Sequence, residues 1–314
     1  MTFPALGTMG YLIGGVVLLL AAASIVGWLI ARRVTSDAAR DTVRNLNSRI
    51  KAWWVMVAIF AAAFIFGKAV TILLFLAVSF YCLREFYSLT PTHPSDHAAM
   101  AAAFYIFLPL QYWLVWIDWV TMLTIAIPVY SFLALPVLSM LKGVTADYLQ
   151  RVAKIQWGLM LAVFCISHAP ALLMLDLGGV PPVQLLFFLV TVVQLSDVLQ
   201  YIAGKLFGRH TMAPNVSPSK TWEGLILGGL AATAVGAALW WITPFSPLEA
   251  AGLAFAIVVA GALGGLVLSA VKRSLGAKDW GVMIEGHGGA LDRMDSVTFA
   301  APLFFHLVNY FFAR

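Results

Sequence analysis

Charged residues are scarce in this chain of 314 residues, since Asp, Glu, Lys and Arg together make up 11% of it. About a quarter of the residues in an average soluble domain are charged. Hydrophobic residues account for 62% of the chain, and its mean hydropathy is +0.92. This composition excludes an ordinary soluble domain and predicts a protein that crosses a membrane several times.

Cysteine is also nearly absent, because the chain contains only Cys82 and Cys165, in separate apolar runs. This excludes a disulfide framework and a cysteine-based metal site, and both thiols are expected to be free and buried. No basic segment precedes the first apolar run, which is long enough to span a bilayer, so we expect no cleavable signal peptide. The net charge of +5 favours loops that face anionic lipid, and we expect no nucleic-acid partner.

Apolar runs predict an all-α bundle of about ten transmembrane helices. The runs cover residues 10–31, 53–67, 69–84, 98–117, 119–141, 152–174, 182–204, 222–243, 248–271 and 296–313. Most of them approach the roughly 20 residues that cross a bilayer. Only Gly67 and Lys68 separate the second run from the third. We count two spans, because one merged span would place the Arg-rich segment 32–51 opposite the later basic loops.

The basic residues predict the orientation of these spans. With ten spans, all the Lys and Arg residues except Lys68 and Arg314 fall in connections on one side. The positive-inside rule then places those connections in the cytoplasm and both termini outside. We expect residues 1–175 to form N-terminal membrane helices and residues 176–314 to form a C-terminal catalytic region with two cytoplasmic active-site loops. A bacterial inner membrane is the expected location.

The few charges gather in one stretch, residues 269–295, which reads SAVKRSLGAKDWGVMIEGHGGALDRMD. The stretch contains Lys272, Arg273, Lys278, Asp279, Glu285, His287, Asp292, Arg293 and Asp295. Its three glycines, Gly286, Gly288 and Gly289, flank the histidine. Cationic side chains and bare backbone N–H groups hold phosphate oxygens, and carboxylates are the ligands that Mg²⁺ prefers. The pattern is typical of a phosphate-and-metal site.

A second polar segment begins inside the seventh predicted span, which contains Asp197. A carboxylate within a span is costly, so it is a functional candidate by default. The loop that follows contains several cations, among them Lys220. Ser219 or Thr221 is expected to cap the eighth helix, with Glu223 in its first turn.

Other polar residues favour structural interpretations. The Arg-rich segment 32–51 either binds anionic headgroups or is an interfacial helix that sets topology, and we favour the second. His93 and His97 have metal-ligand spacing on a helix, but the prolines beside them argue against a helix there. His168 and His306 lie alone within spans, and we expect both to be core histidines.

The two polar segments together resemble the CDP-diacylglycerol synthase (phosphatidate cytidylyltransferase) family. The earlier motif matches at Phe207, Gly208, Pro214, Val216, Ser217, Pro218, Lys220, Thr221, Glu223 and Gly224. The later motif matches at Ser269, Val271, Lys272, Arg273, Lys278, Asp279, Gly281, Ile284, His287, Gly288, Gly289, Asp292, Arg293, Met294 and Asp295. Two motifs in the family's order argue against a chance match. The resemblance covers residues 190–313 strongly, whereas the first six spans match only as hydrophobic helices.

The resemblance implies that CTP and phosphatidate give CDP-diacylglycerol and pyrophosphate at a centre with two Mg²⁺ ions. It implies metal ligands at Asp292, Asp295, Asp279 and Asp197. It implies catalytic roles for Lys272, Arg273, Lys278, His287 and Arg293, and substrate contacts from Ser217, Ser219, Lys220, Gly288 and Gly289. His287 either orients a ligand or fixes the turn. Membrane lipids and a second copy of the chain, in a homodimer, are the implied partners.

The sequence departs from the family most at Gly265, where the family carries an Asp that helps to hold the metals. Leu268, Glu285 and Ala290 are smaller departures. Glu285, Asp197 or a water on the metal can replace the missing acid, so we expect an active but modified enzyme. The alternatives are a cytidylyltransferase for another lipid phosphate, an inactive relative that binds nucleotide or lipid, and a transporter.

Overall fold

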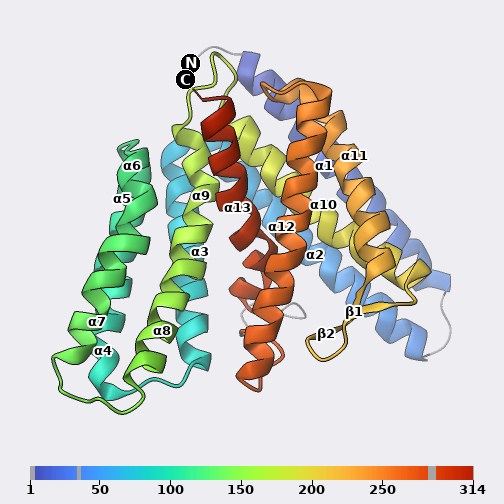
Figure 1. Cartoon of the computed structure of the whole chain (residues 1–314). Helices are drawn as coiled ribbons and strands as arrows, with labels where there is room; N and C mark the ends of the chain where they lie inside the picture. The colour runs from blue at the N-terminus through green and yellow to red at the C-terminus, as the bar shows by residue number, and fades with distance from the viewer. Residues whose placement is uncertain (1–3, 34–36, 282–287, 314) are drawn as a thin grey trace. The chain divides into compact units, whose positions relative to one another are not determined.

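The computed structural model describes residues 4–33, 37–281 and 288–313 (Figure 1). The described chain is helical except for one two-stranded hairpin, which confirms the all-α fold class. Seven of the described helices are long and apolar enough to cross a membrane. The protein is therefore a multi-pass membrane protein.

The described helices account for all ten predicted apolar runs, although three of the runs lie outside the seven long candidates. The second and eighth runs form shorter apolar helices, at Trp53–Ala63 and Gly224–Ala238. The tenth run lies in α13 (Ala290–Phe311). The number of spans and the side on which each terminus lies therefore stay predictions.

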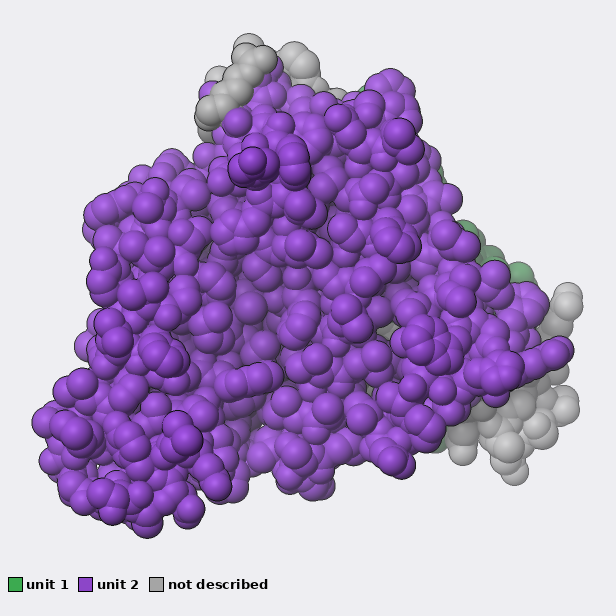
Figure 2. All heavy atoms as spheres, in the orientation of Figure 1, with its two compact units in different colours: residues 1–71, 282–288 green, residues 72–281, 289–314 purple. Residues whose placement is uncertain are grey.

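The chain divides into two compact units, which Figure 2 distinguishes by colour. One unit comprises residues 1–71 and 282–288, and the other comprises residues 72–281 and 289–314. The predicted division into N-terminal membrane helices and a catalytic region at residue 175 concerns function. This division into compact units does not test it, so it stays a prediction.

In the smaller unit, α1 (Pro4–Arg33) pairs with α2 (Asp37–Phe66). Trp54 Nε1 donates a hydrogen bond to Ser24 Oγ at 3.0 Å, so a polar contact joins two otherwise apolar faces. Most of the Arg-rich segment is helical and continues directly into the second apolar run, which fits the structural interpretation. Gly67 then takes φ +85° and separates α2 from α3 (Lys68–Leu89), so the two runs are separate helices as predicted.

In the larger unit, π-helical turns interrupt several spans. The first interrupted helix consists of α4 (His97–Ala102), η2 (Ala103–Phe107) and α5 (Leu108–Trp116). The second consists of α6 (Val120–Ile125), η3 (Ala126–Ser131) and α7 (Phe132–Met140). The next contains α8 (Tyr148–Leu159), η4 (Met160–Cys165), α9 (Ile166–Ala171) and η5 (Leu172–Met174). A short 3₁₀ turn, η1 (Pro94–Asp96), precedes α4, and His93 caps it through Nδ1. His93 and His97 therefore frame a turn and a helix start.

Several polar side chains inside these helices find partners, which lowers the cost of placing them in the bilayer interior. Tyr112 donates to the carbonyl of Phe75 at 2.8 Å, and Gln111 Nε2 donates to the carbonyl of Leu123 at 3.1 Å. The buried side chains of Asp96 and Arg151 form an ion pair at 2.9 Å. These contacts connect helices within the α3–α9 region.

The remaining elements surround the two predicted motifs. They are α10 (Val183–Phe207), β1 (Thr211–Ala213), β2 (Ser217–Thr221), η6 (Gly224–Gly228), α11 (Gly229–Ala238), η7 (Trp240–Ile242), α12 (Pro247–Ser274) and α13. Gly228 lets η6 approach α10 closely, because a Cβ there would overlap the backbone of Gln200. The helix pair α12 and α13 packs along much of its length in Figure 1. These elements bring the C-terminal parts of α10 and α12 near the N-terminal part of α13.

Candidate active site

The loop after α10 folds into a β-hairpin, whereas the sequence predicted only a loop. Strands β1 and β2 pair antiparallel, with Thr211 opposite Thr221 and Ala213 opposite Ser217. Thr221 Oγ1 accepts a hydrogen bond from the N–H of Gly224 at 3.1 Å, so Thr221 caps the next helix as expected. Ser219 is exposed on β2 and is not the cap. The hairpin holds Lys220 in a defined direction.

Glu223 closes this hairpin. Its Oε2 accepts the backbone N–H groups of Arg209 at 3.0 Å and of His210 at 3.2 Å. His210 Nδ1 lies 2.6 Å from Oε1 of the same carboxylate. The hydrogen bond from Arg209, followed by that from the His210 side chain, lowers the pKa of Glu223 to about 2. The sequence predicted Glu223 as a helix-dipole residue, and the structure adds this loop contact.

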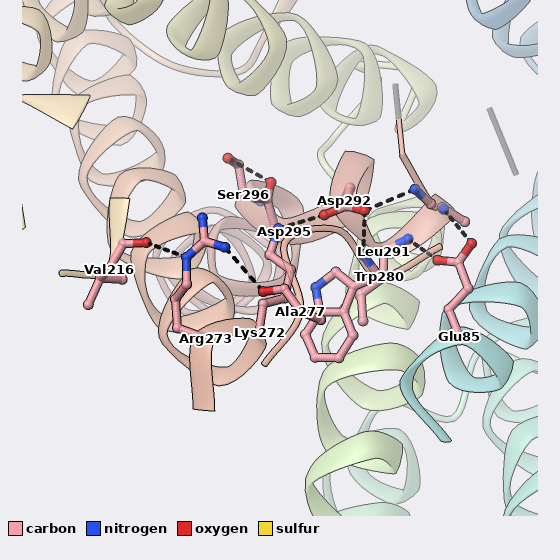
Figure 3. A network of polar contacts seen from close by, with 12 residues as sticks. Glu85, Val216, Lys272, Arg273, Ala277, Trp280, Leu291, Asp292, Asp295 and Ser296 are labelled. Carbon is pink, nitrogen blue, oxygen red and sulfur yellow. Dashed lines mark hydrogen bonds and ion pairs between the residues drawn. The ribbon is translucent and has the colours of Figure 1, made fainter. Parts of the chain in front are cut away.

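Asp292 organises the amino end of α13 (Figure 3). Its Oδ2 accepts the N–H groups of Trp280 at 2.8 Å and of Gly289 at 2.9 Å. Its Oδ1 lies 2.6 Å from Lys272 Nζ, and the side chains of this ion pair are 10% and 9% exposed. A carboxylate at a helix N-terminus is favourable because it satisfies N–H groups that have no intrahelical partner. The carboxylate of Asp292 thus already has three partners, and its metal role stays a prediction.

Glu85, on α3, makes the second anchor of this helix start. Its carboxylate accepts the N–H of Ala290 at 2.8 Å and the N–H of Leu291 at 2.9 Å (Figure 3). Added Cβ atoms at Gly281 and Gly289 would collide with Glu85, so both glycines make room for it. Sequence reasoning missed Glu85, which it assigned to a loop. An acidic residue one position beyond an apolar run was the only signal available.

Two carboxylates from different helices meet at Ser296. Ser296 Oγ donates to Asp197 Oδ1 at 3.0 Å, and the Ser296 N–H donates to Asp295 Oδ1 at 2.7 Å. Asp197 is exposed, although it lies in the middle of a predicted span, and Asp295 is half-buried. These two residues, both predicted as metal ligands, therefore share one accessible location. They offer oxygen donors of the kind that Mg²⁺ takes from proteins, with phosphates and water completing its shell.

The structure does not gather the four predicted metal ligands into one cluster. Among the described residues, no three His, Cys, Asp or Glu side chains lie close enough to hold an ion together. Asp279 is exposed in the turn after α12. Residues Glu285 and His287 lie outside the described residues. The donor set that the structure brings together is therefore Asp197 and Asp295.

The predicted cations have different settings. Arg273 is exposed, and its guanidinium donates to the carbonyls of Val216 at 3.3 Å and of Ala277 at 3.2 Å (Figure 3). It therefore connects α12 to the hairpin. Lys278 is exposed and Arg293 is half-buried. Lys220 Nζ and Asp295 Oδ2 lie 2.6 Å and 3.6 Å from the position that a Cβ atom on Gly265 would take.

The other predicted substrate-binding residues have different local settings. Ser217 is half-buried at the start of β2. Gly289 is the N-cap residue of α13, and its N–H is already bonded to Asp292. Gly288 takes φ +78°, which favours glycine, and it belongs to the smaller unit. Binding roles for these residues stay predictions.

Comparison with known proteins identifies the class to which this arrangement belongs. Residues 47–311 match the model of the cytidylyltransferase family. The chain therefore belongs to the cytidylyltransferase family, a family of nucleotidyltransferases, as its two motifs predicted.

Individual relatives differ in how much of the chain they match. The uncharacterized protein YnbB of Escherichia coli (strain K12) is 35% identical over 85% of this chain and 88% of its own length. The phosphatidate cytidylyltransferase of Mycobacterium leprae is 43% identical over 35% of this chain and 36% of its own. That of Haemophilus influenzae is 40% identical over 41% of this chain and 46% of its own. The matches to these named enzymes thus span less than half of either protein.

Proposed function

We propose that this protein transfers the cytidylyl group of CTP to phosphatidate and produces CDP-diacylglycerol and pyrophosphate. The observation that carries the proposal is the meeting of Asp197 and Asp295 at Ser296, with Lys220 beside them. This charged group belongs to a membrane-embedded chain of the cytidylyltransferase family. Named phosphatidate cytidylyltransferases match 114 to 140 residues of it.

The reaction requires alignment of two phosphates more than covalent catalysis by the protein. An ionised phosphate oxygen of the lipid attacks the α-phosphorus of CTP, and the bond from that phosphorus to the bridging oxygen of pyrophosphate breaks. No proton has to be removed from the attacking oxygen. The protein must hold the two anions in line and offset the charge of the transition state.

The chain's own residues have separable roles in this proposal. Asp197 and Asp295 would hold Mg²⁺, which when bound neutralises charge on the phosphates and orients them. Lys220, Lys278 and Arg293 would bind phosphate oxygens, with Ser217, Ser219, Gly288 and Gly289 as further contacts. Arg273 would add a cation while connecting α12 to the hairpin. Lys272 acts through Asp292 by fixing the start of α13, so we assign it a positioning role.

The remaining partners and the location are part of the same proposal. The substrates are CTP and phosphatidate, within a lipid bilayer, and a homodimer is the expected assembly. The basic loops would place the site on the cytoplasmic face of a bacterial inner membrane, where CTP is available.

A detergent-solubilised assay with CTP labelled in its α-phosphate tests this function across a panel of lipid phosphates. We expect Mg²⁺-dependent transfer of label to phosphatidate, and loss of transfer in both Asp197→Asn and Asp295→Asn. A second candidate is transfer to a different lipid phosphate, because the matches to named phosphatidate enzymes cover less than half of this chain. Preferential labelling of another lipid would establish it. CTP binding without turnover on any lipid would contradict both.

A further inference from the structure

Gly265 leaves a space on α12 that a side chain from the hairpin fills. A Cβ atom at this position would lie 2.6 Å from Lys220 Nζ, 3.6 Å from Asp295 Oδ2 and 3.8 Å from Ser296 Oγ. Any larger residue at 265 would therefore have to move the ammonium group. Glycine is less favourable than alanine in a helix interior, and at this position it leaves the space that Lys220 Nζ occupies.

The ammonium group faces the same part of α12 as the Asp295 carboxylate. Asp197 and Asp295 come from α10 and α13 and share Ser296, so their charges repel each other at close range. Lys220 Nζ lies near the Asp295 carboxylate, because Nζ and Asp295 Oδ2 lie 2.6 Å and 3.6 Å from the position that a Cβ atom on Gly265 would take. Its position is built into the fold, because β2 is paired with β1 next to it, where Thr221 lies opposite Thr211. The ammonium group of Lys220 is thus part of the centre that Asp197, Asp295 and Ser296 form.

We propose that Lys220 Nζ is a resident cation of this centre, in the place of one of the two expected metal ions. The centre then takes up one exchangeable divalent cation, on Asp197 and Asp295. The catalytic use of that ion rests on the proposed function. The number of ions that the centre binds does not depend on the proposed function. A lysine ammonium is a single positive charge on a flexible stem and can also bind a phosphate oxygen.

The proposal predicts that the variant Lys220→Met binds a divalent metal ion more tightly than the wild-type chain does. An ordinary phosphate-binding lysine has little effect on metal binding in the absence of substrate. A lysine that competes for the same carboxylates weakens metal binding, so its removal strengthens it. Loss of one unit charge at close range should tighten Mn²⁺ binding on the order of tenfold or more. Turnover with CTP should fall in the same variant, because the transition state loses a cation.

The test counts Mn²⁺ ions bound to the purified full-length protein by electron paramagnetic resonance, without nucleotide or added lipid. We expect one ion per wild-type chain and, in Lys220→Met, tighter binding with a second ion. Lys220→Arg should behave like wild type. Lys205→Met is the matched control, because Lys205 is exposed near the end of α10 with Nζ 6.0 Å from the Tyr201 ring. It should bind one ion with wild-type affinity.

Gly265→Asp keeps the proposal testable if Lys220→Met fails to fold. It places a carboxylate in the space of the ammonium group and should raise the count to two ions. Two ions or none on the wild-type chain, or unchanged binding in folded Lys220→Met, would overturn the proposal. Its failure is distinguishable from that of the proposed function: one bound ion without CTP turnover contradicts only the function, and turnover with two bound ions contradicts only the resident cation.

Discussion

Lys272 and Asp292 form a buried ion pair between the end of α12 and the start of α13, with Nζ and Oδ1 separated by 2.6 Å. The second oxygen of Asp292 accepts the N–H groups of Trp280 and Gly289. Three of the roughly four acceptor sites of this carboxylate are therefore occupied by the protein itself. Asp295, one turn further along α13, instead shares Ser296 with Asp197. The two aspartates of the motif therefore have different surroundings and different expected effects.

The first prediction contrasts these two aspartates. Asp292→Asn should destabilise the protein by about 3–5 kcal/mol, because it leaves the buried Lys272 ammonium without a counter-charge. Asp295→Asn should abolish turnover and leave the stability unchanged or higher, because it removes one of two repelling charges. Thermal unfolding in detergent and CTP turnover measure the two effects. Wild-type stability in Asp292→Asn would contradict the positioning role of the Lys272–Asp292 pair.

The second prediction concerns Glu85. Glu85→Gln should lower the free energy of unfolding by about 1–3 kcal/mol, because two N–H groups at a helix start lose a charged acceptor. Glu249→Gln is a matched control, since Glu249 also bonds a helix-start N–H, that of Ser246 at 2.7 Å, but at an exposed position. Its effect should be smaller. Equal losses of stability in the two variants would show that the burial of Glu85 adds no stability.

The third prediction follows from the hydrogen bonds that Glu223 accepts. The folded hairpin lowers the pKa of Glu223 from 4.5 to about 2, so the carboxylate stabilises the hairpin above pH 4.5. This contribution should be lost as the pH falls from 4.5 towards 2. Amide hydrogen exchange of residues 208–221, corrected for the intrinsic rate, should therefore show decreasing protection over that interval. Glu223→Gln should remove this pH dependence, and an unchanged profile in that variant would contradict the assignment.

The sequence predicted what composition and short motifs determine. Long apolar runs predicted the helices because the bilayer requires them, and the cost of a charge within a span marked Asp197 as a functional candidate. The family motif predicted site roles for Lys220 and Asp295. These predictions depend on residue type and local spacing, which the chain displays directly.

The rest depended on packing between distant residues. No local pattern pairs Glu85 with the N–H groups of Ala290 and Leu291, which lie more than 200 residues away. For the missing acid at Gly265 the sequence suggested replacement by Glu285, Asp197 or a water, whereas the structure places Lys220 Nζ in the space beside Gly265. Asp292 and Asp295 share a helix and a motif, yet only contacts from α10 and α12 distinguish their surroundings. Such relationships are determined by the tertiary fold.

The last prediction concerns the side of the membrane on which the site lies. The basic residues around the hairpin and after α12 should face the cytoplasm. Ser219 and Ser274 are both exposed there, whereas Trp241 is exposed in η7, at the opposite ends of α11 and α12. Single cysteines at these three positions, in a chain with Cys82 and Cys165 replaced by alanine, report the orientation.

An impermeant thiol reagent applied to intact cells should label Trp241→Cys and leave Ser219→Cys and Ser274→Cys unmodified. A membrane-permeant reagent should label all three, which shows that each thiol is accessible. The physical reason is that moving a cluster of Lys and Arg residues across the bilayer is unfavourable, so the positive loops stay inside. Labelling of Ser219→Cys or Ser274→Cys by the impermeant reagent would place the site outside. CTP could not reach it there, and the proposed function would fail with the orientation.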